Sequence, residues 1–197
     1  MQGRIDLADL GWIVVTHDDR DHAGNLRDLL IAAPNATMVT NGLTLARLGE
    51  EWDVPPHRTL RVNPGARVRL GDRELGFLRP PSFDSPATLA VYDVTARALF
   101  TSDGFGSVVP IPADDAADLR EDDYLAGMTL FTHANAPWVA MTAQHKFGAL
   151  VDAVASLEPA HLLSSHSPDV HGRVRTVLEH MRTIPDRPPW APDADEI

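Results

Sequence analysis

The feature that most restricts the fold is a crowd of charged and imidazole side chains directly after an apolar run. Residues 12–15 (Trp-Ile-Val-Val) are apolar and mostly β-branched, which predicts a buried strand. Residues 16–22 follow at once and contain two histidines and three aspartates. A tight loop there can point alternate side chains into one space, and imidazole and carboxylate are ligands for iron, manganese or zinc. The expected ligands in this loop are His17, Asp19, Asp21 and His22.

The composition limits what else the chain can do. None of its 197 residues is cysteine, which excludes disulfides, iron–sulfur clusters and thiolate zinc sites. The formal net charge is −11, so we expect no general nucleic-acid binding, because phosphate backbones repel such a surface. No apolar run reaches the roughly 18–20 residues of a membrane-spanning helix, and the first residues do not look like a secretory signal. We therefore expect a cytoplasmic protein with no membrane partner.

Strand and helix patterns alternate along the chain, which predicts a layered α/β architecture. The expected strands are residues 12–15, 37–40, 59–62, 67–70, 74–78, 88–92, 98–101 and 161–164. The expected helices are residues 23–33, 43–52, 146–157 and 174–181, with a partly helical acidic stretch at 114–130. We expect one domain over residues 1–184 and a poorly ordered tail, rich in proline and aspartate, over residues 185–197.

One six-residue loop rarely completes a metal site, so further ligands must come from elsewhere. Asp84, Asp103 and His166 each follow a predicted strand or lie in a turn, where sites in layered α/β folds are built. Four aspartates in one pocket would repel one another without cations, and two divalent ions would offset their charge. The residues alone therefore favour a binuclear metal site.

Three segments resemble one known family. Residues 16–25 resemble the metal loop of the metallo-β-lactamase superfamily, His-x-His-x-Asp-His, with Asp19 in place of the second histidine. A carboxylate there is typical of the flavodiiron proteins and of their flavodoxin-free relatives, the oxygen-binding diiron proteins. Residues 99–106 resemble the flavodiiron segment with the bridging aspartate, and residues 164–168 resemble the segment with the last histidine ligand.

The resemblance implies an αββα sandwich and two metal positions. One position would be held by His17, Asp19 and Asp84, and Asp103 would bridge it to the other. The second position would be held by Asp21, His22 and His166. In some family members the histidine that matches His22 turns away from the metal.

Two departures from the family pattern affect these expectations. The family usually has a histidine at the position of Asp84, and an aspartate there is a harder donor that favours iron or manganese over zinc. A surface or capping role explains Asp84 about equally well. Family members also have several strands before the metal loop, whereas sixteen residues precede His17 here. We therefore expect the usual first strands to be lacking and a sheet edge to be open to a partner chain.

We expect a non-haem diiron protein that binds, senses or reduces O2. Such a protein would be an oxidoreductase-like enzyme with two irons and would need an external electron donor. By resemblance to the family we also expect a homodimer. One alternative is a zinc or manganese hydrolase of ester, thioester, lactone or phosphodiester substrates, with Asp21 or Asp103 orienting the water. Another is a degenerate, non-catalytic binding module. The remaining histidines match no ligand motif, although His145 and His171 are open to a role behind the ligands.

Overall fold

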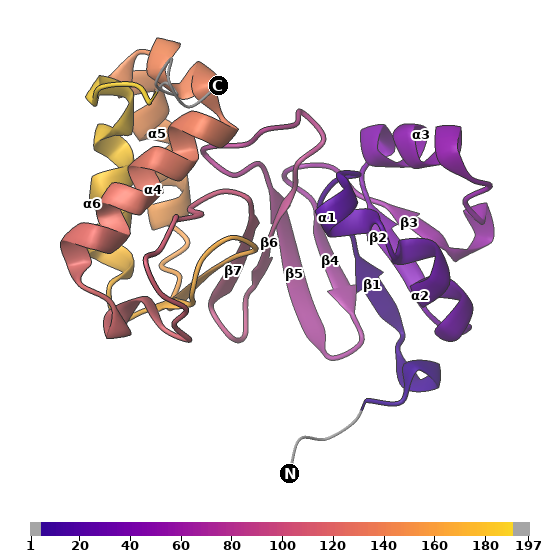
Figure 1. Ribbon diagram of the computed structural model, residues 1–197. Helices are drawn as coiled ribbons and strands as arrows, with labels where there is room; N and C mark the ends of the chain where they lie inside the picture. The colour runs from indigo at the N-terminus through magenta and orange to yellow at the C-terminus, as the bar shows by residue number, and fades with distance from the viewer. Residues whose placement is uncertain (1–4, 191–197) are drawn as a thin grey trace.

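Two β-sheets lie face to face between two layers of helices in the computed structural model, which describes residues 5–190 (Figure 1). Helices α1, α2 and α3 cover the outer side of the first sheet, and α4, α5 and α6 cover the outer side of the second. The layered α/β sandwich expected from the sequence is therefore confirmed.

The first sheet is parallel and has the order β1-β2-β3. Its strands are β1 (Trp12–Val14), β2 (Thr37–Thr40) and β3 (Thr59–Arg61). The helices that connect and cover them are α1 (Arg20–Ala23), α2 (Leu26–Ala32) and α3 (Gly42–Glu51). Within the described part of the chain β1 forms one edge of this sheet, and Trp12 on it is 41% exposed.

The second sheet has the order β4-β5-β6-β7-β8-β9 and is antiparallel except between β7 and β8. Its strands are β4 (Arg67–Leu70), β5 (Arg73–Leu78), β6 (Ala90–Asp93), β7 (Ala98–Ser102), β8 (His161–Ser164) and β9 (Val170–His171). The long helices lie between β7 and β9 or after β9, and are α4 (Glu121–Asn135), α5 (Gln144–Ala155) and α6 (Val174–Thr183). Because β8 runs parallel to β7, the loops after both strands emerge at the same edge of the sheet.

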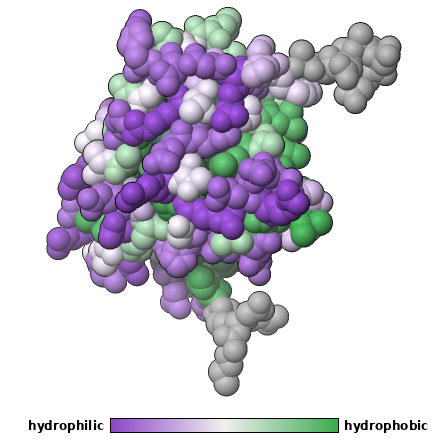
Figure 2. Space-filling model, turned by 90° about the vertical axis from the view of Figure 1, so that its left-hand side faces the viewer, coloured by the Kyte–Doolittle hydropathy of each residue, from purple (hydrophilic) through white to green (hydrophobic). Residues whose placement is uncertain are grey.

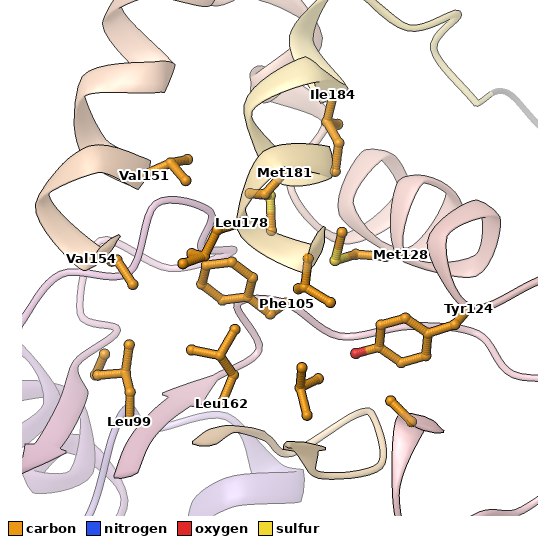
Figure 3. Packing of buried hydrophobic residues seen from close by; sticks show 14 of the residues in the cluster. Leu99, Phe105, Tyr124, Met128, Val151, Val154, Leu162, Leu178, Met181 and Ile184 are labelled. Atoms are coloured by element: carbon orange, nitrogen blue, oxygen red, sulfur yellow. The ribbon is translucent and has the colours of Figure 1, made fainter. Parts of the chain in front are cut away.

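Each pair of neighbouring layers encloses its own apolar core. Strand alternation sends Met38 toward the helices of the first layer and Val39 toward the opposing sheet, where it meets Phe77. The largest core lies between the second sheet and α4–α6, where Phe105 and Leu162 pack beneath Met181 (Figure 3). Three cores of this kind hold the four layers in register, and so keep the strand ends that carry polar loops in fixed positions.

The predicted helix over residues 23–33 is wrong as a single element. The chain forms α1 and α2, with Gly24 and Asn25 between them. A Cβ on Gly24 would lie 2.4 Å from the carbonyl oxygen of Arg20, so this close backbone approach requires glycine. The break separates the short helix that carries Asp21 and His22 from the helix that packs in the core.

Short 3-10 helices complete the chain: η1 (Leu7–Asp9), η2 (Pro56–Arg58), η3 (Ala116–Asp118), η4 (Pro137–Met141) and η5 (Ile184–Asp186). Ile184 and Pro185 are buried, so packing continues into the first residues of the expected tail, whereas residues 191–197 lie outside the described part. The outer face of the α4–α6 layer is largely hydrophilic (Figure 2). Among residues 5–190 no helix has the length and apolar character needed to cross a membrane.

Candidate metal centre

Four loops at one edge of the two sheets bring together all seven residues proposed as ligands. The loop after β1 contributes four of them, and the loops after β5, β7 and β8 contribute one each. Their donor atoms form overlapping groups in which every pair lies within 4.8 Å. The seven residues are His17, Asp19, Asp21, His22, Asp84, Asp103 and His166.

The first group, here called the His17 half-site, consists of His17, Asp19 and Asp84. His17 is fully buried, and its Nε2 lies 3.8 Å from Asp19 Oδ2 and 3.7 Å from Asp84 Oδ2. Oδ2 of Asp103 lies 3.5 Å from the same nitrogen. Metal–ligand bonds of about 2.1 Å place neighbouring donors roughly 3.0–3.5 Å apart. The spacing here is slightly wider than that, and a small inward movement of the aspartates would close it.

The second group, here called the His22 half-site, consists of Asp21, His22 and His166. Oδ2 of Asp21 lies 3.4 Å from His22 Nε2 and 3.3 Å from His166 Nε2. Oδ1 of Asp103 lies 2.8 Å from His22 Nε2 and 3.1 Å from His166 Nε2. The His22 ring therefore faces the cluster in this chain, and the spacing suits one six-coordinate ion.

Asp103 faces both half-sites, one with each oxygen: Oδ2 faces His17, and Oδ1 faces His22 and His166. The turn after β7 holds it there, because Ser102 has a positive φ of 56° and Thr101 Oγ1 donates a hydrogen bond to the Gly104 carbonyl. A Cβ on Gly104 would meet Pro80 Cβ at 3.0 Å, so glycine is needed for the close approach. This geometry is that of a carboxylate that bridges two cations.

Buried polar atoms in the cluster lack hydrogen-bond partners. His17 Nε2, His22 Nε2 and Asp103 Oδ1 are buried, and none makes a hydrogen bond. Although His22 Nε2 and Asp103 Oδ1 lie close together, their orientation is not that of a hydrogen bond. An unsatisfied buried polar group costs about 1–3 kcal/mol. Divalent cations in the two half-sites would satisfy all three atoms, so these residues fit the metal pair that the resemblance implies.

Charge in the cluster is divided unequally between its two most buried carboxylates. Burial by itself raises the pKa of Asp103, but the close approach of His22 and the charges of the neighbouring imidazoles lower it to about 2. Burial and the neighbouring Asp103 carboxylate raise the pKa of Asp84. Burial opposes protonation of His22, yet the nearby carboxylates of Asp103, Asp21 and Asp84 together outweigh this effect and raise the pKa of His22. Asp103 therefore ionises more readily than Asp84, and a cation nearby would favour the ionised form of Asp84.

Hydroxyl groups hold the buried histidine from behind. Nδ1 of His17 lies 3.2 Å from Thr16 Oγ1 and 3.2 Å from Ser102 Oγ, and Ser102 Oγ donates a hydrogen bond to Thr16 Oγ1. With the Nδ1 proton directed at these hydroxyls, Nε2 presents its lone pair to the cluster. Sequence reasoning missed both hydroxyl residues. The available signal was position, because each directly precedes a proposed ligand in the sequence.

Arg47 on α3 contacts the two loops that carry the carboxylates of the His17 half-site. Its Nη1 lies 3.4 Å from both carboxylate oxygens of Asp18 and donates a hydrogen bond of 3.2 Å to Ser85 Oγ. Asp18 precedes Asp19, and Ser85 follows Asp84. The sequence does not single out this arginine, because it lies on a separate helix.

The two histidines considered for a role behind the ligands lie elsewhere. His171 stacks on His161, with 4.5 Å between ring centroids, and His145 is exposed on α5. Behind the His22 half-site lies an aromatic side chain instead. The ring centroid of Phe131 on α4 lies 5.2 Å from that of His166, and a Cβ on Gly106 would lie 2.4 Å from the Phe131 ring.

An apolar hollow of about 440 Å³ lies between the two sheets, beside the cluster. Its walls are mostly apolar side chains of both sheets, and His22, Thr16 and Ser102 also line it.

Comparison with known proteins finds one matching family and several similar sequences. The family described as ODP family beta lactamase matches residues 1–167. An uncharacterized protein of Methanocaldococcus jannaschii is 29% identical over 164 residues, which are 82% of this chain and 40% of that protein. Diflavin flavoprotein A 1 of Synechocystis is 33% identical over 107 residues, which are 54% of this chain and 18% of that protein. The chain thus spans less than half the length of these relatives.

Solved structures share the fold at low identity. Rubredoxin oxygen:oxidoreductase of Desulfovibrio gigas superposes with a TM-score of 0.80 at 18% identity, covering 94% of this chain and 46% of that one. A structure described as the peroxy diiron species of the chemotaxis sensor ODP superposes with a TM-score of 0.71 at 16% identity, covering 90% of this chain and 72% of that one. These likenesses confirm the αββα sandwich of the metallo-β-lactamase type.

Proposed function

The chain belongs to the ODP beta-lactamase family, and on that premise we propose that it is a non-haem diiron protein that binds, senses or reduces O2. The observation that carries the proposal is Asp103, whose two oxygens face two separate groups of imidazole and carboxylate donors. Imidazole nitrogen with carboxylate oxygen is a donor set that suits iron, and the chain contains no thiolate to compete.

The names of the relatives supply the substrate. The Desulfovibrio protein is named as a rubredoxin oxygen:oxidoreductase, and the chemotaxis sensor ODP is described as a diiron species. O2 is small and apolar, so an apolar hollow that His22 helps to line is suited to hold it. No feature of the site favours the hydrolase alternative in the same way.

The residues have separable tasks in this function. Asp103 would hold both ions at a fixed separation, and the hydroxyls of Thr16 and Ser102 would keep the His17 ring directed at its ion. Phe131 would restrict rotation of the His166 ring. Two ferrous ions held by these residues would supply electrons to O2, and the negative charge of the carboxylates would favour the oxidised metal. Continued turnover would draw on an external electron donor.

Several details of the proposal rest on the sequence and the relatives. We propose that the seven clustered residues are the ligands, that residues 1–184 are the functional domain, and that it works in the cytoplasm. A homodimer and the identity of the electron donor are proposals of the same standing.

The test begins with anaerobic purification without added metal. We expect about two irons per chain by elemental analysis, and a new visible absorption band when air is admitted. The variant Asp103→Asn should lose the band, while the control His171→Ala, outside the cluster, should keep it. Tightly bound zinc with no response to air would contradict the proposal and direct the search to hydrolysis.

A further inference from the structure

The loop between β5 and β6 reaches the metal centre through a short side chain, that of Asp84. Its Oδ1 accepts hydrogen bonds from the Ser85 amide at 2.7 Å and from Thr88 Oγ1 at 3.2 Å. Its Oδ2 is the oxygen that faces His17 Nε2. A single methylene joins this carboxylate to the backbone, so the carboxylate moves wherever the loop moves. The local turn therefore sets the direction of the carboxylate, and the path of the loop decides whether Oδ2 reaches the His17 half-site.

Trp138 on η4 holds this loop from the side of the second helix layer. Its indole Nε1 donates a hydrogen bond of 2.8 Å to the carbonyl oxygen of Phe83, the residue before Asp84. The rings of Phe83 and Trp138 also pack together, with 4.8 Å between their centroids. On its other side Trp138 meets the fully buried ring of Phe147 on α5, with 6.5 Å between centroids. The backbone next to Asp84 is thus tied to the core beneath the second helix layer.

Arg47 on α3 holds the same loop from the opposite helix layer. Its Nη1 donates a hydrogen bond of 3.2 Å to Oγ of Ser85, the residue after Asp84. At the start of α3, Asn41 Nδ2 donates a hydrogen bond to the Ala87 carbonyl. The residues on either side of Asp84 are therefore bound to two different helix layers.

These supports lie behind one half-site only. The hydrogen bonds of Trp138 and Arg47 end on the loop that carries Asp84, which belongs to the His17 half-site. The ligands of the His22 half-site come instead from α1 and from the loop after β8. Without a support the Asp84 loop would relax, and its short side chain would no longer meet an ion at bonding distance. The expected effect is therefore confined to one metal position.

We propose that Trp138 and Arg47 are positioning residues that act through Asp84, and that their hydrogen bonds set the metal affinity of the His17 half-site but not that of the His22 half-site. The inference rests on the proposed two-metal function. Loss of a group behind a metal ligand typically weakens metal binding about 10–100-fold, and we expect a loss of this size at the His17 half-site alone.

The experiment titrates metal-free protein with Mn²⁺ and follows the binding by electron paramagnetic resonance. A single bound Mn²⁺ shows resolved hyperfine lines, whereas two ions that share a carboxylate bridge couple magnetically and replace them with a different spectrum. Trp138→Phe removes the indole N–H and keeps an aromatic ring. The coupled spectrum of this variant should need about 10–100-fold more Mn²⁺ to appear, while an isolated ion is still bound. Trp52→Phe, the matched control in the core of the first helix layer, should titrate like the parent.

A double-mutant cycle separates positioning from general structural support. Asp84→Ala removes the ligand through which Trp138 acts, so adding Trp138→Phe to it should cause no further loss of Mn²⁺ affinity. The inference is overturned by an unchanged titration of Trp138→Phe, by equal weakening of both ions, or by an equal loss in the presence and absence of Asp84. If Trp138→Phe does not fold, Arg47→Gln goes through the same cycle with the same expected results.

Failure of the proposed function gives a different pattern. A parent chain that never shows the coupled spectrum would contradict the two-metal function and this inference together. If only the oxygen function fails, the Mn²⁺ titrations behave as expected while the iron-loaded parent ignores air.

Discussion

Removing both metals should lower the thermal stability of the protein by roughly 10–15 °C. Three buried polar atoms of the cluster have no hydrogen-bond partner, namely His17 Nε2, His22 Nε2 and Asp103 Oδ1. Each such atom costs about 1–3 kcal/mol when unsatisfied, so the group costs about 3–9 kcal/mol. A domain of this size loses about 2–4 °C in Tm per kcal/mol. Together these values give a loss in Tm of about 6–36 °C. Water that enters the emptied cluster recovers part of the cost, so we expect a loss in the lower part of this range.

The measurement compares the melting of Mn²⁺-loaded protein with that of protein treated with a chelator, followed by circular dichroism at pH 7.5. Asp103→Asn is the matched control. It removes the buried charge that bridges the half-sites, so its metal-free form should melt no lower than the metal-free parent, and added metal should raise its Tm by only a few degrees. The reasoning is refuted if two metals bind per parent chain and the Tm of that chain does not move.

Further predictions concern single residues. Gly127→Ala should lower the free energy of unfolding by about 1–3 kcal/mol, because the new Cβ would lie 2.0 Å from the Val108 carbonyl oxygen. Gly148→Ala on α5 has open space around the new Cβ and should raise the free energy of unfolding by about 0.5–1 kcal/mol. Urea unfolding measures both changes. Burial and the charge of Arg187 lower the pKa of His180 to about 4, and the unfolded chain takes up this proton near pH 6.5. The contribution of His180 to the free energy of unfolding is therefore complete above pH 6.5 and is lost as the pH falls toward 4. Between these pH values the free energy of unfolding of the metal-free His180→Asn variant should fall less steeply than that of the metal-free parent. Ser102→Ala should weaken metal binding about 10–100-fold in competition with a chelator, and an unchanged affinity would show that the hydroxyl does not orient His17.

Local sequence was enough to predict most elements and to single out four of the seven proposed ligands. The apolar residues of β1 followed by a polar loop place four proposed ligands within six residues, and no distant contact is needed to bring them close. Helix and strand periods likewise predicted α3, α5 and α6 to within a few residues. The helix break at Gly24 was not predicted, because glycine is tolerated inside helices and only the observed path of the backbone shows that it ends α1.

Distant parts of the chain completed the centre. Asp84, Asp103 and His166 were singled out by resemblance and by their position after strands, and their ligand role remains a prediction. What only the tertiary structure decided is how each oxygen is used. Asp103 divides its two oxygens between the half-sites, and Asp84 gives one to its own turn and one to His17. Residue type and spacing determine which donors are available, but the direction of each lone pair depends on how two sheets and the helices behind them pack, since their packing sets the relative positions of loops that lie far apart in the sequence.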